Sequence, residues 1–140
     1  LAMQCSSCAL SNYPRISPCV IFLITRGNEI LLATAKGRRN SFYSNLAGFI
    51  EAGETAEETI HREAFEEVGI TLKNICYFGS QSWPFPGQLM LAYTAEYDAN
   101  EINIDPREIE HAAWFKADSM PTVPPLSSIS GQLIASFLNR

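Results

Sequence analysis

Three glutamates between residues 63 and 67 have the spacing that brings carboxylates together on one side of a helix. Glu63, Glu66 and Glu67 stand at positions i, i+3 and i+4, which share a helical face. Carboxylates this close repel one another and raise each other's pKa values. A divalent cation removes the repulsion, and hard oxygen ligands suit Mg²⁺ or Mn²⁺. The spacing alone predicts either a metal site or a solvated acidic face.

The residues around these glutamates predict the helix that carries them. Thr55 can cap its N-terminus, and Glu58 completes a capping box. Gly69 is suited to the residue that ends a helix. An apolar stripe at i, i+4 and i+8 is formed by Ile60, Ala64 and Val68. The helix is therefore expected to pack one side on a sheet and to present an acidic side.

The rest of the chain alternates short apolar runs with turn residues. Strands are expected at residues 19–25, 29–35, 46–50, 72–80, 89–97 and 111–116, a Pro-rich loop at 83–87 and a last helix at about 128–138. This order predicts an α/β fold, with a mixed β-sheet sandwiched between α-helices. Cys19 and Cys76 lie inside apolar runs and are expected to be buried thiols.

Composition restricts the class of protein. The chain has 140 residues, of which 46% are hydrophobic and 18% charged, as in a single globular domain. Its net charge of -5 argues against a general nucleic-acid binder, although bound metal ions can still attract a nucleotide. No apolar run approaches the ~20 residues of a membrane span. Without an export signal, a cytoplasmic location and no membrane partner are expected.

Residues 48–70, GFIEAGETAEETIHREAFEEVGI, resemble the Nudix box, G-x5-E-x7-R-E-U-x-E-E-x-G-U, where U is a bulky aliphatic residue. The matching residues are Gly48, Glu54, Arg62, Glu63, Glu66, Glu67, Gly69 and Ile70. Ala64 is a looser fit to the first U. The resemblance implies the Nudix fold, an α/β/α sandwich, and metal-dependent cleavage of a pyrophosphate.

The resemblance also implies roles for the residues of the box. Mg²⁺ or Mn²⁺ would be held by the three helical glutamates, with Glu63 either a ligand or the base. Gly48 would permit close backbone approach, and Arg62 would pair with Glu54 to hold the loop on the helix. Bound metals neutralise and orient a pyrophosphate and lower the pKa of bound water. A carboxylate can then remove a proton from that water.

A second segment, residues 80–88 (SQSWPFPGQ), resembles the S-Q-P-W-P-F-P-x-S signature of the NADH pyrophosphatase branch of this family. Ser82 replaces a proline and Gln88 the final serine. Prolines stiffen such a loop, and aromatic rings offer faces for a flat base. Gln81 can hydrogen-bond a carboxamide or a ribose. The implied substrate-binding residues are Gln81, Ser82, Trp83, Pro84, Phe85, Pro86, Gly87 and Gln88; alternatively, the aromatic residues only cover the core.

Further site residues are implied by the same branch. Glu108 would be another acidic residue near the metals, although Glu110 could take that part with poorer spacing. Tyr13 would reach across the interface of a homodimer. The remaining implied pocket residues are Ala47, Phe49, Met90 and Ser130. Of these, Phe49 could instead be plain strand core.

Cys5 and Cys8 form a C-x-x-C pair, which is half of a four-cysteine zinc site. They resemble the end of the zinc ribbon of this branch, although two incidental exposed cysteines are the alternative. Residues 1–14 are accordingly expected to be a remnant of that ribbon and linker, and residues 15–140 the Nudix catalytic domain. Because the chain starts with Leu1, we expect a fragment. Because it lacks the other C-x-x-C pair, we do not expect it to hold the structural Zn²⁺ alone.

The leading hypothesis is hydrolysis of NADH or NAD to nicotinamide mononucleotide and AMP, with NAD-capped RNA as a further substrate. A rival within the family is a pyrophosphatase for ADP-ribose or another nucleoside diphosphate derivative, which the Trp-Pro-Phe-Pro segment disfavours. A rival of another class is a non-catalytic nucleotide sensor, which is expected to lose a glutamate of the box. A fragment that folds but is inactive is the third alternative.

Overall fold

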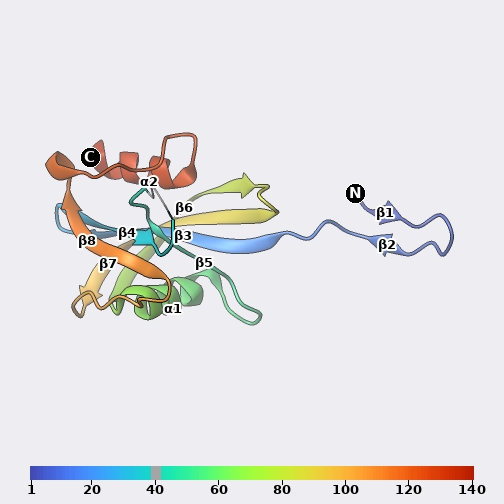
Figure 1. Cartoon of the computed structure of the whole chain (residues 1–140), viewed down its shortest axis with the longest axis horizontal. Coiled ribbons are helices and arrows are strands. Elements are labelled where there is room, and N and C mark those ends of the chain that lie inside the picture. Colours follow the sequence, from blue (N-terminus) through green and yellow to red (C-terminus); the bar gives the residue numbers. More distant parts are fainter. Residues whose placement is uncertain (39–41) are drawn as a thin grey trace.

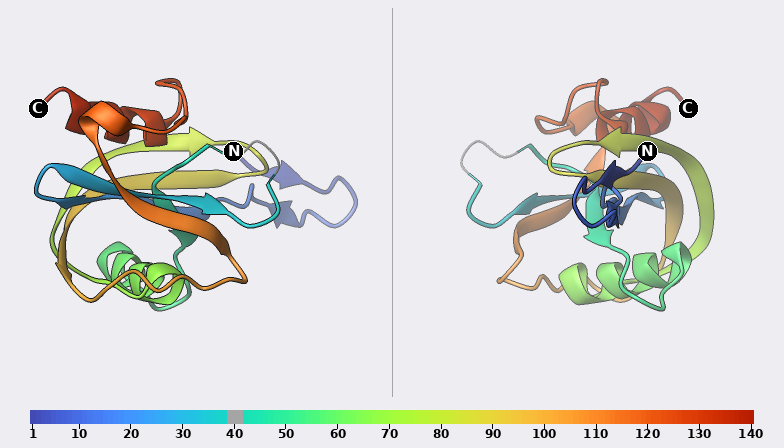
Figure 2. Two further views of the ribbon diagram at one scale, coloured as in Figure 1. Left: turned by 60° about the vertical axis from the view of Figure 1, so that its left-hand side comes forward. Right: turned by 90° about the vertical axis from the view of Figure 1, so that its right-hand side faces the viewer.

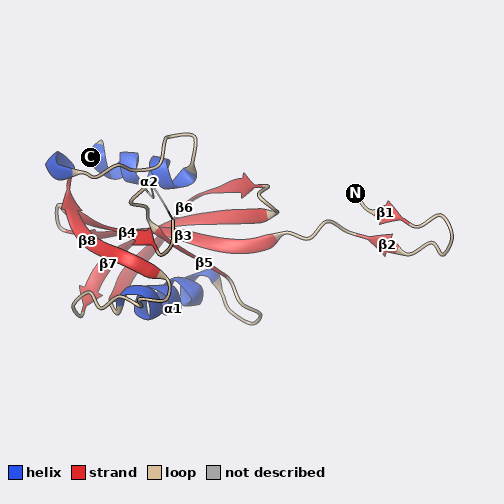
Figure 3. Ribbon diagram, in the orientation of Figure 1, coloured by secondary structure: helices blue, strands red, loops and turns tan. Residues whose placement is uncertain are grey.

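Strand β3 (Ser17–Arg26) is the centre of a mixed sheet. The computed structural model describes residues 1–38 and 42–140, and within them the sheet has six strands (Figures 1 and 3). β3 runs parallel to β7 (Gln88–Ala99) and antiparallel to β4 (Glu29–Ala35) and β5 (Leu46–Phe49). The seven apolar or weakly polar residues from Cys19 to Thr25 are all buried, as expected of a strand covered on both faces.

The sheet forks along β3. The first half of β3, Cys19 to Phe22, pairs with β5, whereas the second half, Ile24 to Arg26, pairs with β4. β4 and β5 therefore leave the same side of β3 and diverge. The outer strands are β8 (Ile109–Lys116), which pairs with β4, and β6 (Thr71–Trp83), which pairs with β7.

Two helices cover the two faces of the sheet (Figure 2). α1 (Ala56–Val68) packs on a core that includes Val20 and Phe22, and α2 (Ile129–Leu138) packs on one that includes Ile21 and Leu23. Successive residues of β3 therefore belong to cores on opposite faces of the sheet, as the pleat of a strand requires. The expected α/β class, a mixed sheet between helices, is confirmed.

The local signals for α1 are also confirmed. The Thr55 side chain accepts a hydrogen bond from the Glu58 amide, and the Glu58 carboxylate accepts one from the Thr55 amide. Gly69 ends the helix at φ 75°, a conformation that favours glycine. The expected apolar stripe is fully buried: Ile60, Ala64 and Val68.

The hairpin of β6 and β7 extends further than the sequence indicated. Trp83, expected in a loop, is the last residue of β6 and pairs with Gln88. Only Pro84 to Gly87 form the turn. β6 and β7 are longer than the sequence predicted because their backbone hydrogen bonds continue through residues that lack an alternating apolar pattern.

The prediction that Cys76 is buried was wrong, since this thiol is exposed. β6 is an edge strand, and its register shifts between Lys73 and Cys76, where Asn74 has φ 51°. This irregularity breaks the inward alternation that the apolar run suggested. Cys19 is buried as expected.

The first residues form a small hairpin of β1 (Met3–Gln4) and β2 (Ser11–Asn12), which extends away from the sheet in Figure 1. Cys5 and Cys8 are exposed between these strands. A short 3-10 helix, η1 (Ala117–Ser119), follows β8. In the described part of the chain, no helix has the length and apolar character needed to cross a membrane.

Candidate active site

Arg62 joins the loop before α1 to the carboxylates on the helix. Its Nε and Nη2 donate to the two oxygens of Glu54 at 2.6 and 2.9 Å. Nη1 donates to Glu63 and Glu66 at 2.8 and 3.1 Å, and Nη2 also donates to the Phe49 carbonyl at 3.1 Å. These bonds use all five N–H groups of the guanidinium. The expected Arg62–Glu54 pair is therefore present, and the arginine has no donor left for a ligand.

This hydrogen-bond network shifts the pKa values of both Glu54 and Arg62. Hydrogen bonding from Arg62 lowers the pKa of Glu54 to about 2. The same bond to Glu54 is the largest cause that raises the pKa of Arg62. Glu54 also accepts a bond from Thr59 Oγ1 at 2.9 Å, so both of its oxygens are engaged.

The helical glutamates differ in their exposure. The side chain of Glu66 is 59% exposed and that of Glu63 12%, while Glu67 as a residue is 8% exposed. Burial, followed by the charges of Glu63 and Glu108, raises the pKa of Glu67 to about 8. Burial is also the main cause that raises the pKa of Glu63. Glu67 Oε2 is buried without a hydrogen-bond partner among the described residues.

Gly48 on β5 lies against one of these carboxylates. A Cβ atom built at Gly48 would overlap the carboxyl group of Glu63. Only a glycine leaves room for this side chain between the strand and α1. The close backbone approach expected at this position is therefore an approach of β5 to Glu63.

The loop before β8 is fastened to the end of α1, and it carries Glu108. The Asp105 amide donates to the Glu67 carbonyl at 2.9 Å, and the Asp105 carbonyl accepts from Ile109 at 2.9 Å. The Asp105 side chain holds Arg107 at 2.6 Å, which lowers the pKa of Asp105 to about 2. The loop thus brings Glu108, but not Glu110, into the cavity that Glu67 lines.

We name the cavity beside α1 the carboxylate cavity; its volume is about 450 Å³. The expected site residues that line it are Ala47, Gly48, Phe49, Arg62, Glu63, Glu66, Glu67, Gln88, Met90 and Glu108. Cys19 and Glu51 also line it and were not expected. Burial, with the charges of Glu63 and Glu67, raises the pKa of the Cys19 thiol to about 11.

The carboxylates share this cavity without converging on one point. Among residues 1–38 and 42–140, no three histidine, cysteine, aspartate or glutamate side chains form a group that could hold a metal ion as they stand. Arg62 binds one oxygen each of Glu63 and Glu66. Their other oxygens are left for another ligand.

A second cavity, which we name the hairpin cavity, has a volume of about 400 Å³ and lies between the β6–β7 hairpin and the start of α2. It is lined by the expected residues Gln81, Trp83, Gln88, Met90 and Ser130. Gln88 and Met90 line the carboxylate cavity as well. The two cavities therefore adjoin along the first residues of β7.

Gln81 does not have the free amide that the sequence suggested. Its Nε2 donates to the Ser127 carbonyl and its Oε1 accepts from the Ile129 amide, both at 2.9 Å. Gln81 thus bonds β6 to the first turn of α2. In this structure the neighbouring backbone therefore supplies a partner for both polar atoms of the amide.

Other expected residues lie away from the cavities. Ser82 lines neither cavity, although its neighbours Gln81 and Trp83 line the hairpin cavity. The hairpin turn, residues 84–87, lines neither cavity, and Phe85 is 72% exposed with its ring edge-on to Trp83. Tyr13 is exposed and lies between β2 and β3.

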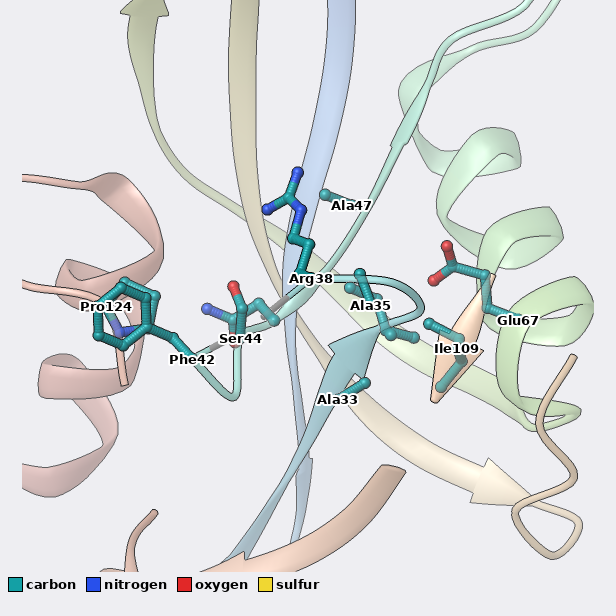
Figure 4. Close-up of a pocket in the computed structure, with 11 residues that line it drawn as sticks. Ala33, Ala35, Arg38, Phe42, Ser44, Ala47, Glu67, Ile109 and Pro124 are labelled. Carbon is teal, nitrogen blue, oxygen red and sulfur yellow. The ribbon is translucent and has the colours of Figure 1, made fainter. Parts of the chain in front are cut away.

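A third cavity, which we name the fork cavity, occupies the divergence of β4 and β5 and has a volume of about 520 Å³ (Figure 4). Glu67 lines it from α1, and Arg38 lines both this cavity and the hairpin cavity. Asn45, also in the lining, donates through Nδ2 to the Ser130 carbonyl at 3.1 Å. Arg38 and Asn45 lie between the strands expected at residues 29–35 and 46–50, where the sequence indicated no site residue, so they were missed.

Comparison with known proteins agrees with this geometry. Residues 14–137 match the model of the NUDIX domain. Curated relatives called NAD-capped RNA hydrolase NudC include one from Vibrio parahaemolyticus, 49% identical over 138 residues (99% of this chain, 53% of the relative), and one from Chromobacterium violaceum, 49% identical over 140 residues (100% and 53%). The chain thus spans about half the length of the curated relatives it matches.

Solved structures share the fold at low sequence identity. A NUDIX hydrolase from Nitrosomonas europaea has a TM-score of 0.80 at 17% identity, covering 97% of this chain and 77% of that one. The MutT NUDIX hydrolase from Burkholderia pseudomallei has a TM-score of 0.74 at 21% identity, covering 87% of this chain and 98% of that one. The family match over most of the chain and the shared fold lead to one conclusion: the chain belongs to the Nudix family.

Proposed function

We propose that this chain is a metal-dependent pyrophosphohydrolase that cleaves NADH or NAD to nicotinamide mononucleotide and AMP. The observation that carries the proposal is the adjacency of the carboxylate cavity and the hairpin cavity, which share Gln88 and Met90. Acidic groups for phosphate chemistry therefore lie next to a largely apolar space beside Trp83. A dinucleotide can occupy both because its pyrophosphate is joined to flat heterocyclic rings.

The carboxylate cavity fits Mg²⁺ or Mn²⁺ by its donor set. Glu63, Glu66, Glu67 and Glu108 offer only hard oxygen donors, which these ions prefer. Glu67 Oε2 is buried without a partner among the described residues, and such an atom is costly to leave unpaired. We propose that these four glutamates hold the ion. When bound, the ion would neutralise the pyrophosphate charge and lower the pKa of attacking water.

The remaining residues of the cavity have supporting roles in this proposal. Arg62 orients Glu63 and Glu66 and fixes the loop through Glu54. Gly48 leaves the space that Glu63 needs. Either Glu63 or Glu67 can accept a proton from water, since both carboxylates are largely buried and line the cavity. Phe49 and Ala47, also in the lining, would contact the substrate on the nicotinamide side.

The hairpin cavity supports a substrate with a flat base. Trp83 contributes an aromatic face, Met90 an adaptable apolar side chain, and Gln88 the amide in the place of the usual serine. The curated relatives are called hydrolases of NAD-capped RNA. We therefore include NAD-capped RNA among the proposed substrates, with the RNA chain continuing from the adenylate.

Three further features belong to the proposal. Cys5 and Cys8 would supply two of four ligands to a structural Zn²⁺. Tyr13, on the exposed N-terminal segment, would contact a second copy in a homodimer. Reduced cysteines of this kind are typical of the cytoplasm, which is the proposed location.

The proposal is tested by incubating the chain with NADH, NAD, ADP-ribose and a nucleoside triphosphate. Each substrate is assayed with Mg²⁺, with Mn²⁺ and with chelator, and AMP release is followed. Metal-dependent AMP from NADH or NAD supports the proposal. Turnover of ADP-ribose alone would favour the rival pyrophosphatase. Nucleotide binding without any turnover would favour the non-catalytic nucleotide sensor, or a chain that folds but is inactive.

A further inference from the structure

The glutamates of the carboxylate cavity repel any phosphate group that lies too far from bound metal ions to be neutralised by them. Such a phosphate needs positive charge from a side chain of the protein. Five glutamates line the carboxylate cavity, and the cation among its lining residues is Arg62. All five N–H groups of Arg62 already bind Glu54, Glu63, Glu66 and the Phe49 carbonyl. Arg62 therefore has no donor to offer a phosphate oxygen.

Arg38 is placed to supply that charge. It lines the fork cavity, which Glu67 also lines, and it lines the hairpin cavity together with Trp83 and Met90. Gly37 turns the chain after β4 at φ 76°, which brings the following arginine back over the fork. Figure 4 shows Arg38 and Glu67 around the same cavity. Arg38 thus stands between the acidic groups and the apolar space for a base.

Within the residues that the structure describes, the guanidinium of Arg38 forms no ion pair with an acidic side chain. The ion pairs of residues 1–38 and 42–140 involve Arg26, Arg62, Lys73 and Arg107, and none includes Arg38. A guanidinium presents paired N–H groups that match two oxygens of a phosphate. Its charge would also offset the repulsion between a phosphate and the neighbouring glutamates.

We propose that Arg38 is a substrate-binding residue that holds a phosphate group between the fork cavity and the hairpin cavity. This inference rests on the proposed function, and it adds a residue outside both motifs that identified the site. The phosphate has two possible sources in the proposed substrates. It is either part of the pyrophosphate of NAD or the phosphate that joins the adenylate of NAD-capped RNA to the next nucleotide.

The test compares Arg38→Gln, Arg38→Lys and the parent chain on NAD and on a short NAD-capped RNA. Lys73→Gln is the matched control, because it removes one positive charge from an exposed position of β6 that lines none of the three cavities. Equilibrium binding of ADP and of the capped RNA, each with Mg²⁺, is measured for every variant as a readout independent of turnover. Thermal melting checks that each variant is folded.

We expect Arg38→Gln to lower kcat/KM about tenfold or more, mainly through KM, and to weaken the salt dependence of binding. Arg38→Lys should recover part of the loss, since it keeps the charge but not the paired geometry. A loss on both substrates and on ADP assigns the pyrophosphate. A loss on capped RNA alone assigns the phosphate that follows the adenylate.

Equal behaviour of Arg38→Gln and Lys73→Gln on both substrates and ADP would overturn the inference while leaving the proposed function intact. If the parent hydrolyses neither substrate, the proposed function fails. Binding of ADP and of capped RNA then still decides about Arg38: weaker binding of either by Arg38→Gln than by Lys73→Gln supports its phosphate contact, and equal binding of both, or no binding by the parent, overturns it.

Discussion

Arg62 and Glu54 are joined by two hydrogen bonds, of 2.6 and 2.9 Å, between the guanidinium and both carboxylate oxygens. This paired geometry is stronger and more directional than a single contact between charges. It fastens the loop before α1 to the middle of the helix. Because the other donors of Arg62 bind Glu63 and Glu66, the pair also determines where those carboxylates lie.

Replacement of Arg62 by lysine should lower both stability and activity. Arg62→Lys keeps the charge but cannot make five hydrogen bonds, so we expect a loss of about 1–3 kcal/mol in the free energy of unfolding. Denaturant unfolding measures the loss. Arg26→Lys is the control, since its pair with Glu29 is more exposed and should contribute less than about 1 kcal/mol. Equal losses for the two variants would contradict this account of Arg62.

The Glu54 carboxylate should make stability depend on pH. Its folded pKa is lowered from 4.5 to about 2, so its contribution is present above the unfolded pKa and declines as the pH falls toward the folded value. Glu54→Gln should therefore be less stable than the parent at about pH 6, and the difference should narrow by about pH 3. Urea unfolding across this range is the measurement. A difference that stays constant or widens on acidification would show that the pair is not the cause.

Gly48→Ala should impair activity by displacing Glu63. The added methyl group would overlap the Glu63 carboxyl, and a shift of about 1 Å in a reacting group can cost on the order of 100-fold in rate. Gly79→Ala is the control, because the nearest atom to its Cβ would be Ile129 Cδ1 at 4.0 Å. Steady-state kinetics and thermal melting of both variants separate a local effect from unfolding. Full activity of Gly48→Ala would refute the steric argument.

Gln81 should act by holding the start of α2 rather than by contacting the substrate through its amide. Gln81→Leu removes the acceptor for the Ile129 amide, whereas Gln81→Glu keeps an acceptor and loses the donor to Ser127. We expect faster hydrogen exchange at Ile129 in Gln81→Leu than in Gln81→Glu, with a rise in KM that follows the same order. Unchanged exchange in Gln81→Leu, with a raised KM, would instead point to direct substrate contact.

Local signals in the sequence were sufficient to predict α1 and to place the acidic residues on it. Thr55, Glu58 and Gly69 define the ends of the helix by interactions between near neighbours, which a sequence displays directly. The continuous apolar run at residues 19–25 likewise predicted a strand, which the structure buries as part of β3. The site residues on this helix could therefore be located before any tertiary structure was known.

Features that depend on contacts between distant segments were not predictable. The fork between β4 and β5 follows from the unequal pairing of the two halves of β3, and it places Arg38 beside the cavities. The amide of Gln81 was expected to be available to a substrate. It is instead hydrogen-bonded to the backbone of residues 127 and 129, nearly fifty positions away in the chain. Cys76 is exposed because of a register shift in an edge strand, which the residue types do not reveal.

The central claim is tested most directly by AMP release from NAD with Mg²⁺ or Mn²⁺, in the parent and in Glu67→Gln. The account predicts turnover by the parent that chelator abolishes. It also predicts a loss of at least about 100-fold in Glu67→Gln, because even partners of metal ligands contribute roughly 10- to 100-fold. Turnover that persists in chelator, or a fully active and folded Glu67→Gln, would contradict the claim.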